Sequence, residues 1–153
     1  FDRRGTDSVI TYQSSTRCCS DDFADALARQ LNLSGMKYKK DEGGVYTDSA
    51  EFVDIIPECT NLSVGYYKEH TVNESQNIKH LEKLAEACLK VDWENLPTKR
   101  DPSKTEYNKR SDIYKKKLKW IKEQNNKGHK FKLDQNFFNI YLASKRDFCP
   151  AKI

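Results

Sequence analysis

The balance of charge reverses along the chain, and the reversal falls at a proline-bounded stretch, residues 97–102, that is typical of a linker. Residues 1–94 carry 11 Lys and Arg against 17 Asp and Glu, a net charge of −6. Residues 95–153 carry 16 against 6, a net charge of +10. Such an asymmetry predicts two parts with different surfaces and different partners. We therefore predict a first part, residues 1–97, and a basic extension, residues 98–153.

The composition predicts a small soluble protein. The chain has 153 residues, of which 37% are hydrophobic and 33% charged, and its mean hydropathy is −0.89. No apolar run approaches the roughly 20 residues that a membrane span needs, so no membrane partner is expected. The chain begins with Phe1 in place of Met, which predicts a processed protein or a fragment.

The cysteines predict reduced thiols and a cytoplasmic location. There are five of them, an odd number, and none forms the CxxC pair that is typical of metal sites. The adjacent pair Cys18 and Cys19 is poorly placed for both sulfurs to face one tetrahedral metal ion. A zinc site built from cysteine is therefore not expected.

The first part alternates between predicted strands and helices. β-Branched and aromatic residues predict strands over residues 8–13 and 59–67. Ser20, followed by two aspartates, predicts the start of a helix that ends near Asn32. Apolar residues at helical spacing predict a second helix over residues 75–93. This order of elements predicts an α/β layered fold.

The basic extension is predicted to be helical, with one long Lys-rich helix after residue 107 and a shorter one over Asp134 to Arg146. Its densest cationic run contains Lys115, Lys116, Lys117, Lys119 and Trp120. Cations beside an aromatic ring suit phosphate contacts and base stacking. A charge run on a helix is more often a solvated surface, and docking of the extension onto the acidic first part is a third reading.

Several runs of the first part resemble one known superfamily. They are Phe1-Asp2-Arg3-Arg4-Gly5, Thr11-Tyr12-Gln13, Val45-Tyr46-Thr47-Asp48-Ser49 and, above all, PECTNLSVGYYKEHT from Pro57 to Thr71. Together they resemble the carboxyl-terminal half of the co-catalytic zinc peptidases. More narrowly, they are similar to peptidase-like proteins of bacteria and bacteriophages that are related to the zinc aminopeptidases. The resemblance covers about residues 1–94 and stops at the predicted linker.

This resemblance implies a three-layer αβα sandwich with a mixed sheet, and two zinc ions at the carboxyl edge of that sheet. Asp2 matches the family's later aspartate ligand and His70 matches its final histidine ligand, so both would hold the same zinc ion. The implied reaction is attack of a metal-activated water on a peptide or amide bond. From the residues alone, Asp2 would pair with a neighbouring arginine and His70 would be an exposed loop residue.

The chain departs from the family pattern in what it lacks. It has no Glu-Glu pair and no histidine before His70, so the bridging carboxylate, the general base and the ligands of the other metal are missing. We therefore expect the carboxyl-terminal portion of a longer hydrolase, with the general base upstream of Phe1. We predict that this chain alone does not hydrolyse peptides.

Three further residues are candidates for the surroundings of the metal. Asp48 would orient His70 or line the cleft, unless it only caps a helix. Glu58 would reach the metal edge, unless it forms a surface ion pair. Tyr66 and Tyr67 face opposite sides of a strand, so one of them, Tyr66, would line the pocket. His80 and His129 are predicted to be solvated.

The alternative to a hydrolase is a non-catalytic binding module that keeps the same scaffold. Its Lys-rich extension would contact nucleic acid or a partner protein. The partners expected for the hydrolase are a peptide or amide substrate and the missing amino-terminal half of the domain. A homo-oligomer stays open under both interpretations.

Overall fold

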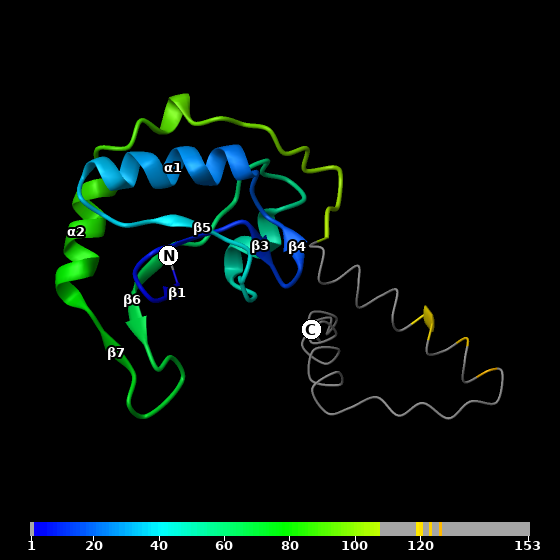
Figure 1. Ribbon diagram of the computed structural model, residues 1–153, viewed down its shortest axis with the longest axis horizontal. Helices are drawn as coiled ribbons and strands as arrows, with labels where there is room; N and C mark the ends of the chain where they lie inside the picture. The colour runs from blue at the N-terminus through cyan, green and yellow to red at the C-terminus, as the bar shows by residue number, and fades with distance from the viewer. Residues whose placement is uncertain (1, 108–118, 121–122, 124–125, 127–153) are drawn as a thin grey trace, which may run out of the picture. The chain divides into compact units, whose positions relative to one another are not determined.

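The computed structural model describes residues 2–107, 119–120, 123 and 126 (Figure 1). The chain divides into two compact units, Phe1–Glu106 and Tyr107–Ile153. In the described part of the chain, no helix has both the length and the apolar character needed to cross a membrane.

The named elements all lie in the first unit (Figure 1). In chain order they are β1 (Arg3–Arg4), β2 (Ser8–Ile10), β3 (Tyr12–Gln13), β4 (Thr16–Arg17), α1 (Asp21–Leu33), β5 (Lys39–Asp41), the 3-10 helix η1 (Asp48–Phe52), β6 (Ser63–Tyr67), β7 (Ser75–Gln76), α2 (Ile78–Cys88) and the 3-10 helix η2 (Trp93–Asn95).

The longest strand of the described residues, β6, lies at the centre of a mixed sheet. It runs parallel to β1 on one side and antiparallel to β7 on the other. Among the described residues, β2 forms a parallel pair with β5, and β3 forms an antiparallel pair with β4. Together with α1 and α2, these strands make a mixed α/β fold, as the sequence predicts.

The predicted first helix is confirmed as α1. The Ser20 hydroxyl caps it by accepting a hydrogen bond from the Phe23 amide at 3.1 Å, and two aspartates occupy its first turn, where the helix dipole favours them. Its buried residues follow the predicted spacing and include Leu27 and Leu31. The helix therefore packs one apolar face on the core.

Apolar side chains of both helices meet those of the strands in one core. α1 contacts β2 and β5, while α2 contacts β6. Val9, Leu27 and Leu31 are fully covered, and Val64 and Leu84 belong to the same cluster. Burial of a side chain of this size stabilises a fold by about 1.5–3 kcal/mol. The core therefore fixes the position of β6, from which the candidate site extends.

Two predicted elements differ in extent from the structure. The strand predicted over 8–13 breaks at Thr11, whose amide donates to the Asp41 carbonyl at 3.0 Å while its own carbonyl accepts from the Cys18 amide at 2.9 Å. The chain thus changes partner there, from β5 to β4. The helix predicted over 75–93 begins only at Ile78, because residues 75–76 pair with β6.

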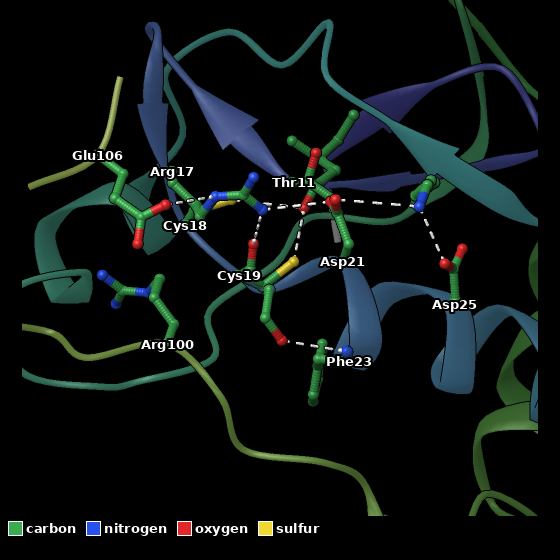
Figure 2. A network of polar contacts seen from close by, with 12 residues as sticks. Thr11, Arg17, Cys18, Cys19, Asp21, Phe23, Asp25, Arg100 and Glu106 are labelled. Atoms are coloured by element: carbon green, nitrogen blue, oxygen red, sulfur yellow. Dashed lines mark hydrogen bonds and ion pairs between the residues drawn. The ribbon is translucent and has the colours of Figure 1, made fainter. Parts of the chain in front are cut away.

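Residues 97–106 belong to the first compact unit, although the sequence predicts a linker over residues 97–102. Arg100 is buried and donates to the backbone carbonyls of residues 53, 56 and 57. At the end of this segment, Glu106 accepts the Arg17 amide at 2.8 Å and forms an ion pair with the Arg17 guanidinium at 3.0 Å (Figure 2). The compact unit therefore continues past residue 97.

Candidate metal site at the carboxyl end of β6

A bulge in β6 sets Tyr66, near its carboxyl end, opposite Arg4, the last residue of β1. Arg3 lies opposite Ser63, yet the next residue of β1, Arg4, lies opposite Tyr66. Two residues of β6 are therefore accommodated without a partner, which bends the strand locally. As a result, Tyr66 is opposite a position only two residues after Asp2.

Gly65 supplies the backbone conformation that the bulge requires. Its φ of 81° lies in the left-handed region, its amide donates to the Gly5 carbonyl at 2.7 Å, and its carbonyl accepts the Asn77 amide at 2.7 Å. A Cβ atom at this position would lie 3.0 Å from Asn77 Cβ and 3.2 Å from both the Asn77 carbonyl oxygen and His80 Cδ2. The close approach of β6 to the start of α2 therefore needs a glycine.

We expect the substitution Gly65→Ala to lower the free energy of unfolding by about 2–4 kcal/mol, because left-handed strain adds to overpacking against backbone. Gly35→Ala is the matched control. Gly35 has a φ of 75°, but its Cβ would meet only the flexible end of the Lys83 side chain. Chemical denaturation followed by circular dichroism measures both variants. Equal losses would contradict the role of packing at Gly65.

Asp2 stands at the amino end of β1, beside Asn61. The Asp2 amide donates to the side-chain oxygen of buried Asn61 at 2.8 Å, and the residue itself is exposed. The hydrogen bond between Tyr66 and Glu74 raises the pKa of Tyr66 to about 12, and the negative charges of Glu74, Asp2 and Glu69 add to this shift. Asp2, Tyr66 and Glu74 are therefore electrostatic neighbours.

His70 lies in the loop of residues 68–74, which follows β6 directly. His70 and Lys68 both have left-handed φ values, 63° and 53°, which are uncommon for residues other than glycine. The His70 amide donates to Glu74 Oε2 at 2.9 Å. The hydrogen bond from Tyr66, followed by that from the His70 amide, lowers the pKa of Glu74. Backbone strain of this kind often accompanies functional sites, so the loop is a candidate site.

The structure does not give Asp2 and His70 a complete ligand set. The Asp2 amide is bonded to Asn61, which precedes β6, whereas His70 follows the end of this strand, where its amide is bonded to Glu74. Within the described residues, no group of three or more His, Cys, Asp or Glu side chains is arranged to hold a metal. A catalytic zinc ion needs about three protein ligands, so these two residues would make only part of a site.

Tyr66 and Tyr67 face different environments, as alternation along a strand requires. Tyr66 is half-buried and packs against the core, and the Glu74 carboxylate raises the pKa of its hydroxyl. Tyr67 is exposed. Tyr66 therefore joins the core to the loop that carries His70.

Asp48 is the first residue of η1 and is exposed. Its neighbours fix this segment to β3: the Thr47 hydroxyl donates to Gln13 Oε1 at 3.0 Å, and Gln13 Nε2 donates to the Ser49 hydroxyl at 2.8 Å. Thr47, not Asp48, occupies the N-cap position of η1. These two hydrogen bonds hold the start of η1 against β3.

Glu58 is a structural clamp between the start of α1 and the segment after η2. Its Oε2 accepts the Ser20 amide at 2.6 Å, and its Oε1 accepts the Ser20 hydroxyl at 2.9 Å, the Lys99 amide at 2.7 Å and the Arg100 amide at 3.0 Å. Both carboxylate oxygens are used by these donors. The sequence prediction of a pocket role for Glu58 misses this arrangement, because Lys99 and Arg100 lie about 40 residues away in the chain.

Polar groups also tie the start of α1 to its surroundings. Figure 2 shows the Arg17 guanidinium between Glu106, Asp21 and the Cys19 carbonyl, with distances of 3.0, 3.2 and 3.2 Å. The sulfurs of Cys18 and Cys19 lie 3.4 and 3.2 Å from the Ile10 carbonyl oxygen. Both thiols are free and buried, which agrees with the prediction of reduced cysteines among the described residues.

The sequence predicts that His80 is solvated, but in the structure it is partly buried and lies beside Tyr38. Its Nε2 lies 3.1 Å from the Tyr38 hydroxyl, and that hydroxyl also contacts the Ser63 carbonyl oxygen. Since a hydroxyl has one hydrogen, donation to Ser63 leaves the Tyr38 oxygen to accept from His80. The sequence feature that bears on this contact is the glycine within the strand, Gly65. Its missing side chain allows α2, which carries His80, to approach β6 closely.

Most of the predicted cationic run lies outside the described residues, namely Lys115, Lys116 and Lys117, and so does His129. Lys119 and Trp120 are described; both are helical and exposed.

The sequence matches no protein-family model, and no curated protein and no solved structure matches it.

Proposed function

We propose that this chain forms the carboxyl-terminal part of a zinc-dependent peptidase or amidohydrolase, with Asp2 and His70 as two ligands of one zinc ion. The observation that carries the proposal is the β6 bulge, which sets Tyr66, four residues before His70, opposite Arg4, two residues after Asp2. A carboxylate and an imidazole are ligands that zinc accepts. The sequence resemblance supports the same pair.

The surrounding residues suit a positioning role at such a site. Glu74 accepts the His70 amide, so the loop of residues 68–74 is closed on itself beside the end of the strand. Zinc, when bound, would supply an activated water for attack on a peptide or amide substrate. The remaining ligands and the general base would come from the amino-terminal half, which would also complete a three-layer αβα sandwich. The chain alone would then be inactive.

Zinc titration of the full chain tests the pair directly. We expect weak binding of zinc ion, measured by competition with a chromophoric chelator, and an increase in Kd of about tenfold for Asp2→Ala or His70→Ala. If both residues hold one ion, the double variant should lose little more zinc affinity than either single variant, because the effects of two residues in one site are not additive. His129→Ala is the matched control for loss of one histidine.

Equal weakening by His129→Ala, or strictly additive losses in the double variant, would contradict a shared site. Zinc-dependent cleavage of an aminoacyl reporter by the wild-type chain would contradict its predicted inactivity.

A binding module is the second candidate function. The adjacent exposed residues Lys119 and Trp120, within a region of net charge +10, favour it. Binding of DNA or RNA that weakens with salt, in a chain that does not bind zinc, would favour this alternative.

A further inference from the structure

One helical turn of the first unit presents apolar side chains to solvent. Residues 52–56 form a closed turn in which the Ile55 and Ile56 amides both donate to the Phe52 carbonyl, at 3.0 and 2.7 Å. Residues at positions i, i+3 and i+4 of such a turn lie on one face. On this turn, Phe52 is 49% exposed, Ile55 is 73% exposed and Ile56 is 43% exposed. We call this face the apolar knob.

The apolar knob is held rigidly from the inside of the fold. The buried Arg100 guanidinium donates to the carbonyls of Val53, Ile56 and Pro57. Three hydrogen bonds from one planar group leave this turn little freedom. A rigid apolar face loses little conformational entropy when it binds, so the knob is pre-organised for a contact.

The surroundings of the knob are acidic. Residues 41–67 contain six Asp and Glu residues and no Lys or Arg. Glu51 and Asp54 lie within or beside the turn, and both are exposed. An apolar centre with a charged rim is the usual arrangement of a protein interface, and the sign of the rim selects the partner.

We propose that the apolar knob docks a basic, amphipathic segment of a partner protein. Its apolar side chains would cover Phe52, Ile55 and Ile56, and its lysines or arginines would face Glu51 and Asp54. The acidic rim argues against a second copy of the same surface, because two such rims would repel each other.

Fluorescence anisotropy of the full chain with a labelled synthetic helix tests this docking. The probe is an amphipathic peptide of leucine and lysine about five helical turns long. We expect Phe52→Asp and Ile55→Asp each to weaken its binding about tenfold or more, and added salt to weaken wild-type binding. Each substitution adds one negative charge to the chain. If attraction to the basic peptide were purely electrostatic, these variants would therefore bind the peptide more tightly than wild type.

Leu33→Asp is the matched control, because Leu33 is 88% exposed at the end of α1 and the substitution adds the same charge. Its binding should equal that of wild type, and thermal unfolding should show that all variants remain folded. Absence of wild-type binding, or equal binding by the Phe52→Asp and Ile55→Asp variants, would overturn the proposal. So would a wild-type dimer that Phe52→Asp dissociates, since the occupant would then be a second copy.

Discussion

The substitution Gly44→Ala is expected to lower the free energy of unfolding by more than about 3 kcal/mol, or to prevent folding of the first unit. A Cβ atom on Gly44 would lie 2.1 Å from the Tyr12 carbonyl oxygen and 2.4 Å from Ile10 Cγ2. One of these atoms is backbone and the other is in a nearly fully buried side chain. Neither can move without separating residue 44 from β3, to which it is bridged at Gln13.

The neighbouring glycine provides the control for this experiment. A Cβ on Gly43 would approach the Asp41 side chain at 3.0 Å and Arg3 Nη2 at 3.7 Å, and both are ends of side chains. We expect Gly43→Ala to change the free energy of unfolding by less than about 1 kcal/mol. Urea denaturation followed by circular dichroism compares the two variants, and equal stabilities would refute the steric argument.

The substitution Arg100→Ala is expected to cost about 3 kcal/mol or more, because it leaves three carbonyls of the 53–57 segment without their donor. Arg100 is only 7% exposed, so water does not readily replace the guanidinium. The loss would also leave a cavity beneath the apolar knob. Arg100→Lys should recover only part of the stability, since an ammonium group cannot reproduce the planar fork of donors.

Lys99→Ala serves as the control for the loss of one positive charge. Lys99 is exposed, and its contact with Glu58 is made by the backbone amide, which alanine retains. We expect a change within about 0.5 kcal/mol, measured by the same denaturation. A loss as large as that of Arg100→Ala would show that charge, and not the buried hydrogen bonds, stabilises the segment.

The helices could be predicted because their signals are local. Ser20 with two following aspartates marks the start of α1, and the spacing of Leu27 and Leu31 marks its buried face. The short strands could not be predicted in the same way. β1 and β7 have two residues each, and they form only because β6 supplies hydrogen-bonding partners about 60 and 10 residues away in the chain.

The candidate site also has parts that local sequence signals predict and parts that depend on contacts distant in the chain. His70 was predicted from its place after a strand, and the structure does place it in the loop after β6. The bulge that sets Tyr66 opposite Arg4 depends on the left-handed conformation of Gly65, which a strand pattern does not reveal. The sequence does not predict the clamp of Glu58, because three of its four donors are backbone amides, which carry no sequence signature.

The hydrogen bonds of Glu58 also determine where this chain can be shortened for recombinant work. A fragment that stops at the charge reversal, after residue 97, would lose the two amides of Lys99 and Arg100 that Glu58 accepts, as well as the buried guanidinium. It would also lose the partner of Arg17 at Glu106. A truncation that preserves the first unit should therefore end after Glu106, where the compact unit itself ends.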